Sequence, residues 1–124
     1  MPTLGQASLS PGERRALERF VELLRESFGD SLRSVWLYGS RARGEPPHAD
    51  SDVDVLVIND RGSWSADLER ANRLLWQAAE AEGLEPLYFS AHVGDLDWLA
   101  RRREIRSFYI QEVDRDKIVL AGDP

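Results

Sequence analysis

The chain has 124 residues, of which 42% are hydrophobic and 31% are charged, a size and composition typical of one globular domain. The lack of cysteine excludes disulfide bonds, thiolate metal sites and cysteine nucleophiles, and the formal net charge of −6 argues against a protein that coats nucleic acid. No apolar run approaches the roughly 18 residues of a membrane span, and the first residues lack the pattern of a signal peptide, so we expect a cytoplasmic protein with no membrane partner.

The N-terminal half of the chain predicts a helix and two strands. Residues 1–9 are expected to be a flexible lead, and residues 10–124 to form a single domain. Ser10 and Glu13 fit a capping box with Pro11 in the first helical position, and a helical apolar face then runs to Gly29, where the helix is expected to end. Residues 33–38 and 52–58 are predicted to be strands. In the second strand three valines point to one face, and Asp52, Asp54, Leu56 and Ile58 point to the other.

The C-terminal half predicts two more helices and two more strands. A helix is expected over residues 66–82, a strand over 86–93, a helix from an Asp95 cap to about residue 113, and a short closing strand over 116–121. Two strands joined directly and then followed by a helical crossover indicate a mixed β-sheet flanked by helices, in the order α-β-β-α-β-α-β. We therefore predict an α/β (α+β) fold.

The chemistry is concentrated where the first two strands meet. Asp52 and Asp54 leave the same face of a strand, roughly 6 to 7 Å apart along the backbone. Two carboxylates so close repel each other and one pKa rises unless a cation lies between them; Mg²⁺ binds such oxygen ligands together with substrate phosphates. In the preceding turn, Gly39 lets a backbone approach closely, and Ser40 offers a hydroxyl beside backbone amides that suit phosphate oxygens.

Two arginines extend this candidate nucleotide site. Arg41 and Arg43 follow directly in the turn and are candidates for charge-assisted bonds to phosphates, the alternative being a solvated loop. The turn is not a Walker A loop, because Gly-Lys-Ser/Thr is missing, and it is not a dinucleotide fingerprint, because the second glycine is absent.

The spacing of these residues resembles a known family. Gly39-Ser40, then eleven residues, then Asp52-Val53-Asp54-Val55 is similar to the signature of the nucleotidyltransferase superfamily, and "GSRARG" with "SDVDVLV" resembles its minimal nucleotidyltransferases. The resemblance implies the polymerase-beta-like nucleotidyltransferase fold. It also implies transfer of a nucleoside monophosphate, AMP from ATP in the simplest case, to a protein or small acceptor, with release of pyrophosphate.

The resemblance further implies roles and partners. Asp52 and Asp54 would be the catalytic residues that hold Mg²⁺, and Gly39 and Ser40 would hold the triphosphate. Several minimal nucleotidyltransferases are antitoxins paired with a small helical HEPN protein, so a HEPN-like partner is an expectation here. Assembly into a homo-oligomer is a further expectation.

One feature departs from the family pattern. Active members usually carry a third carboxylate on the next strand, where this chain reads "PLYFSAHV" without an acid. Ser90 or His92 would take that position, and His92 is a candidate base. We expect that substrate binding survives and that intrinsic turnover is weak. The alternative function is a degenerate nucleotidyltransferase domain that acts as a nucleotide- or partner-binding module.

Two other features allow more than one interpretation. Arg101, Arg102, Arg103 and Arg106 form a basic stretch that is either a solvated helix face or a surface for a partner or an RNA acceptor. Trp64 is either a packing residue or a cover for a nucleotide base.

Overall fold

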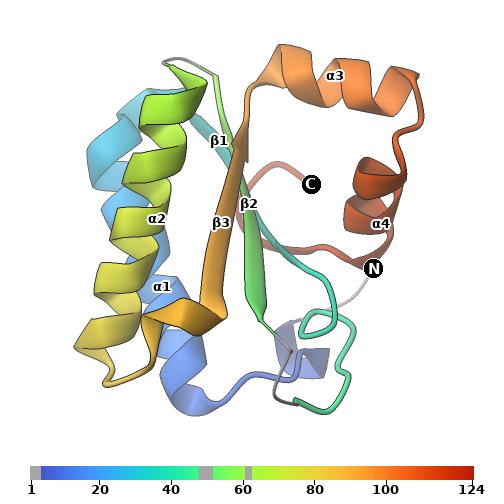
Figure 1. The fold of residues 1–124 in the computed structure, drawn as a ribbon. Helices are drawn as coiled ribbons and strands as arrows, with labels where there is room; N and C mark the ends of the chain where they lie inside the picture. The colour runs from blue at the N-terminus through green and yellow to red at the C-terminus, as the bar shows by residue number, and fades with distance from the viewer. Residues whose placement is uncertain (1–3, 48–51, 61–62) are drawn as a thin grey trace.

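The computed structural model describes residues 4–47, 52–60 and 63–124 and shows a β-sheet with helices on both faces (Figure 1). The described strands are β1 (Leu32–Tyr38), β2 (Val53–Asn59), β3 (Phe89–Gly94) and β4 (Ile118–Gly122). They form a four-stranded sheet in the order β3-β2-β1-β4. β1 runs antiparallel to both β2 and β4, and β3 runs parallel to β2, which confirms the predicted mixed sheet.

The alternation of side chains along β2 decides which helices cover which face. α1 (Pro11–Phe28) and α2 (Trp64–Ala81) lie on one side of the sheet, and α3 (Leu96–Glu104) and α4 (Phe108–Asp116) lie on the other (Figure 1). Val53, Val55 and Val57 are fully buried in the cluster that includes residues of α1 and α2. Leu56 and Ile58 are buried in a second cluster with residues of α3 and α4. The predicted assignment of faces is therefore confirmed.

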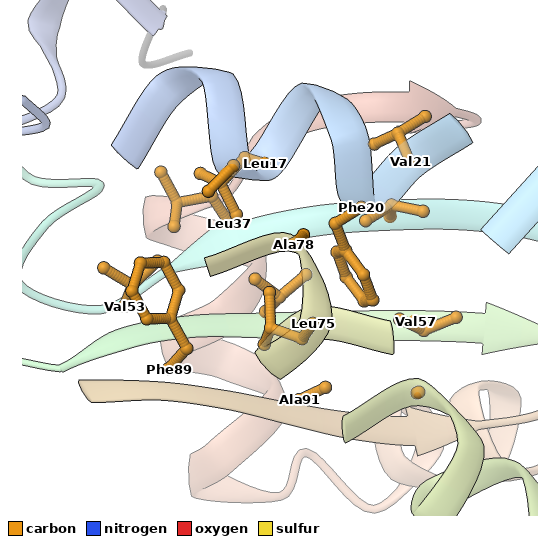
Figure 2. Packing of buried hydrophobic residues seen from close by; sticks show 14 of the residues in the cluster. Leu17, Phe20, Val21, Leu37, Val53, Val57, Leu75, Ala78, Phe89 and Ala91 are labelled. Atoms are coloured by element: carbon orange, nitrogen blue, oxygen red, sulfur yellow. The ribbon is translucent and has the colours of Figure 1, made fainter. Parts of the chain in front are cut away.

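The larger cluster joins α1, α2 and the sheet. Figure 2 shows Phe20 of α1 and Leu75 of α2 between the two helices and the strands, and both are 0% exposed. Their burial fixes α1 and α2 against β1 and β2, the two strands that flank the candidate site. No described helix is long and apolar enough to cross a membrane.

The start of α1 forms as its sequence predicts. The Glu13 amide donates to the Ser10 hydroxyl at 3.1 Å and the Ser10 amide donates to the Glu13 carboxylate at 2.7 Å, with Pro11 in the first turn. This reciprocal pair satisfies two amides that a helix start otherwise leaves unpaired.

The described part of the expected N-terminal lead makes defined contacts. Leu4–Gln6 form a short 3₁₀ turn, and Ala7 is only 8% exposed within the larger cluster. The Ser8 amide donates to the carbonyl of Arg41 at 2.8 Å. Residues 4–9 therefore pack against the domain, whereas residues 1–3 lie outside the described part of the chain.

Two predicted elements differ in the structure. The single helix expected from Asp95 to about residue 113 is two helices, because Arg106 adopts a left-handed conformation (φ 53°) and Ser107 caps a new helix by accepting from the Ile110 amide at 3.2 Å. The element order is therefore α-β-β-α-β-α-α-β. The strand expected over 86–93 begins at Phe89, because Pro86–Tyr88 form a 3₁₀ turn that Glu85 caps.

Side chains of α2 close the outer edge of β3. An edge strand presents backbone groups that lack a neighbouring strand and invite pairing with another chain. Here two tryptophan indoles and one asparagine amide bind those groups at 2.9 to 3.1 Å. The bonded pairs are Trp76 with Phe89, Asn72 with Ala91 and Trp64 with Val93.

Asn72 forms two hydrogen bonds with the β3 edge, because its side chain both donates to the Ala91 carbonyl and accepts from the Ala91 amide. We expect Asn72→Ala to lower the free energy of unfolding by about 1–3 kcal/mol, the usual penalty for leaving such groups unpaired. Chemical denaturation measures this change. Arg73→Ala, which removes a solvent-exposed contact with Glu69, is the matched control and should cost less than about 0.5 kcal/mol. An equal loss in both variants would contradict the role given to Asn72.

Candidate nucleotide and metal site

The end of β1 and the start of β2 bring the glycine turn and the carboxylates together. In the antiparallel register Tyr38 lies opposite Asp54, and Gly39 follows Tyr38 directly. A Cβ built on Gly39 would lie 3.4 Å from Oδ2 of Asp54, and Gly39 has φ +82°. The Asp54 carboxylate therefore lies beside the turn, within van der Waals reach of a side chain at position 39.

The environment of Asp54 makes its ionised form less favourable than that of a carboxyl in water. Burial raises the pKa of the Asp54 carboxyl, and repulsion from Asp52 raises it further, whereas His92 acts in the opposite direction. A cation between the two carboxylates would relieve both effects. Among the described residues no group of three or more His, Cys, Asp and Glu side chains is placed to hold a metal ion. Two carboxylates fit Mg²⁺, which commonly completes its coordination with substrate phosphates and water.

The turn after β1 contains one hydrogen bond of the helical i→i−4 type and closes with a longer i→i−5 bond. The Arg43 amide donates to the Gly39 carbonyl at 3.1 Å, and the Glu45 amide donates to the Ser40 carbonyl at 3.1 Å. The methyl group of Ala42 is buried in the larger cluster and anchors the turn. The start of the turn, at Gly39 and Ser40, thus resembles the N-terminus of a helix, where backbone amides suit phosphate oxygens.

The two arginines of the turn contact carboxylates of the protein itself. Nη1 of Arg41 lies 2.9 Å from both carboxylate oxygens of Glu13, and the residue is only 7% exposed. Arg43 forms a 2.8 Å bond to the buried carboxylate of Asp116 and a second bond to Glu45. Both arginines were candidates for phosphate contact, and both are engaged in ion pairs in this structure.

β3 contributes no carboxylate to the site. Ser90 lies opposite Asp54, and His92 lies two residues further along, opposite Leu56. Both point away from the buried face of the strand, as predicted: Ser90 is half-buried and His92 is exposed. The acids that flank β3 have structural roles, since Glu85 caps the preceding turn and Asp95 caps α3.

A pair of tyrosines borders the site and was missed by the sequence analysis. The hydroxyl of Tyr109 in α4 donates to that of Tyr38 at 3.0 Å, and the ring of His92 lies 6.2 Å from both rings. Burial raises the pKa of Tyr38 strongly, and the negative charge of Asp54 acts in the same direction. Tyr38 was detectable as the residue before Gly39, but nothing in the sequence placed Tyr109 beside it.

The basic stretch of α3 has mixed roles. Arg103 pairs with Asp114 at 2.8 Å and lies over the ring of Trp36, so it packs α3 against α4 and the sheet. Arg102 lies 5.7 Å over the ring of Trp98, and all four arginines of the stretch are exposed. The stretch is therefore an exposed basic helix face from which Arg103 also contributes to packing, and its use as a partner surface stays a prediction. Trp64, the candidate base cover, is 62% exposed and binds Val93, at the far end of β3 from Ser90.

Comparison with solved structures shows the same fold in two toxin–antitoxin complexes. A complex of MntA and HpeT that carries a tyrosine-to-alanine mutation matches with a TM-score of 0.50 and 20% identity, over 83% of this chain and 69% of the matched chain. A toxin–antitoxin complex with AMP-PNP matches with a TM-score of 0.54 and 18% identity, over 86% and 73% of the two chains.

Comparison of sequences also finds similarity to nucleotidyltransferases. A protein of Methanocaldococcus jannaschii named as a candidate protein adenylyltransferase is 33% identical over 48 residues, which cover 39% of this chain and 47% of that protein. The chain thus spans about half the length of this curated relative. The family model described as a nucleotidyltransferase domain matches residues 17–116, which include the glycine turn, Asp52, Asp54 and β3. This chain belongs to the nucleotidyltransferase domain family.

Proposed function

We propose that the protein is a Mg²⁺-dependent nucleotidyltransferase that transfers a nucleoside monophosphate, AMP from ATP, to a hydroxyl of a protein or small acceptor. The observation that carries the proposal is the position of the Asp54 carboxylate beside the Gly39-Ser40 turn. Tyr38 pairs with Asp54, and Oδ2 of Asp54 would lie 3.4 Å from a Cβ built on Gly39. This arrangement places a carboxylate beside a turn that suits phosphate, in a chain of the nucleotidyltransferase domain family.

Each side of the site has a role in this proposal. Asp52 and Asp54 would hold Mg²⁺, which when bound would supply positive charge against the triphosphate. The amides and the hydroxyl at Gly39 and Ser40 bind the triphosphate. Because the turn occupies the β1 side of Asp54, the acceptor hydroxyl approaches from the β3 side, where Ser90 lies opposite Asp54.

We propose a HEPN protein as the acceptor and partner. Support comes from the fold, which this chain shares with members of toxin–antitoxin complexes, one of them with AMP-PNP. The relative named as a candidate protein adenylyltransferase favours a protein acceptor. A second candidate function is a nucleotide- or partner-binding module with weak turnover, and the lack of a carboxylate on β3 favours it.

Transfer of label tests the proposal and separates the two candidates. The full chain is incubated with Mg²⁺, ATP labelled at the α-phosphate and a purified HEPN protein, taken from the neighbouring reading frame where that frame encodes one. An enzyme leaves label on the HEPN protein and releases pyrophosphate, and both products disappear when EDTA is added. A binding module forms a complex with the HEPN protein or with ATP but transfers no label. Failure to bind either one would overturn both candidate functions.

A further inference from the structure

The glycine turn is tied to the N-terminal part of the chain through Arg41. The Arg41 guanidinium binds both oxygens of Glu13 at 2.9 Å and the carbonyl of Ser8 at 3.0 Å. In return, the carbonyl of Arg41 accepts from the Ser8 amide at 2.8 Å. The Arg41 and Glu13 side chains are 8% and 15% exposed. A charge pair this well shielded is sensitive to loss of either partner, because the remaining charge stays buried without compensation.

Glu13 serves two structures at once. The same carboxylate that binds Arg41 accepts from the Ser10 amide in the capping box of α1. Burial opposes the charged form of Glu13, but the bonds from Arg41 and Ser10 prevail and lower its pKa. The start of α1, itself packed on the sheet, is thereby connected to the turn.

A second contact seats the same turn. Gly44 has φ +79°, and a Cβ at this position would overlap the carbonyl of Gln6. The N-terminal segment therefore lies directly against the end of the turn, while Ala42 anchors its middle in the core. Arg41 lies between Ser40 and Ala42, so restraint of its backbone also restrains the backbone of Ser40.

We propose that Arg41 and Glu13 form a latch that holds the Gly39-Ser40 turn in the shape that binds a triphosphate, so that Arg41 is a positioning residue and not a phosphate ligand. The inference rests on the proposed function, because it takes the turn to be the triphosphate site. A pre-shaped turn raises affinity, since a site that is competent in only a fraction of molecules binds with its affinity reduced by that fraction.

The two roles of Arg41 predict opposite effects of a change at Glu13. Glu13→Gln keeps a residue that suits the capping box and removes the negative charge from the latch. If Arg41 is a positioning residue, Glu13→Gln weakens binding. If Arg41 is a phosphate ligand, Glu13→Gln releases its guanidinium and leaves affinity unchanged or higher.

Calorimetric titration of the full chain with Mg²⁺ and AMP-PNP tests the latch. We expect Glu13→Gln and Arg41→Gln each to weaken binding about tenfold, as when the binding shape falls to about one molecule in ten, and the double variant to be no weaker than either single one. Arg41→Lys should bind more tightly than Arg41→Gln when Glu13 is present. Combined with Glu13→Gln, the lysine should give no such gain. Glu82→Gln, which weakens the pairs of Glu82 with Arg15 and Arg19 of α1 away from the turn, should bind like the unmodified chain.

Other outcomes separate the latch from the proposed function. Each variant is titrated well below its own melting temperature, with folding verified by circular dichroism. Unchanged or tighter binding by Glu13→Gln, or additive losses in the double variant, would overturn the latch and leave the nucleotide site in place. No binding by the unmodified chain would overturn the proposed function and the latch with it.

Discussion

Asp54→Asn is expected to abolish Mg²⁺-dependent binding of ATP and, in the absence of metal, to raise the melting temperature by a few degrees. Asparagine keeps the shape of the side chain but removes the charge that Mg²⁺ needs. It also removes the repulsion from Asp52 and the cost of burying an ionised carboxylate, the two effects that raise the pKa of Asp54. The measurements are calorimetry with Mg²⁺ and AMP-PNP, and thermal unfolding in EDTA.

The stability gain should depend on pH in a defined direction. A carboxyl whose pKa is raised in the folded state stabilises the fold below its unfolded pKa, and this contribution is lost as the pH rises through the folded value. The difference in melting temperature between Asp54→Asn and the unmodified chain should therefore be present at neutral pH. It should shrink as the pH falls toward the ordinary value of 3.8.

The matched control is Asp60→Asn, just beyond the other end of β2, where the carboxylate forms an exposed pair with Arg33. This change should leave ATP binding intact and should not raise stability. An Asp54→Asn protein that still bound ATP in a Mg²⁺-dependent manner would show that the metal lies elsewhere.

Gly39→Ala is expected to weaken binding of Mg²⁺ and AMP-PNP by at least tenfold, and it should also destabilise the protein. Two physical effects act together. Alanine at φ +82° is strained, which costs about 1–2 kcal/mol for an L-residue in the left-handed region. The added methyl group would also lie 3.4 Å from Oδ2 of Asp54. It would fill the space between the carboxylate and the turn, where Mg²⁺ and the triphosphate are proposed to bind.

Gly83→Ala separates the two effects. Gly83 follows α2 with φ +73°, and a Cβ there meets nothing within 4 Å. Both variants should lose a similar amount of stability in chemical denaturation, but only Gly39→Ala should lose affinity in calorimetry. Equal affinity in the two variants would mean that close contact with Asp54 is irrelevant to binding.

Neighbouring strands made the centre of the site predictable from the sequence. β1 and β2 are consecutive and antiparallel, so the end of one meets the start of the other, and Gly39-Ser40 must lie near Asp52 and Asp54. The alternation along β2 also assigned the carboxylates to one face and the valines to the other. The start of α1 was equally readable, because a capping box is formed by residues only three apart.

The long-range contacts of the candidate site could not be predicted from local sequence patterns. Arg41 finds Glu13 across 28 residues, Arg43 finds Asp116 across 73, and Tyr109 reaches Tyr38 across 71. A guanidinium pairs with a carboxylate that packing brings close to it. The pattern of residues along a single helix or strand does not show which carboxylate that is. The sequence by itself determined the fold class, the faces of β2 and the meeting of turn and carboxylates, because these follow from local hydrogen bonding and strand geometry. Packing alone decided the partners of the two arginines and the tyrosine beside the site, because those contacts join elements that only the folded chain brings together.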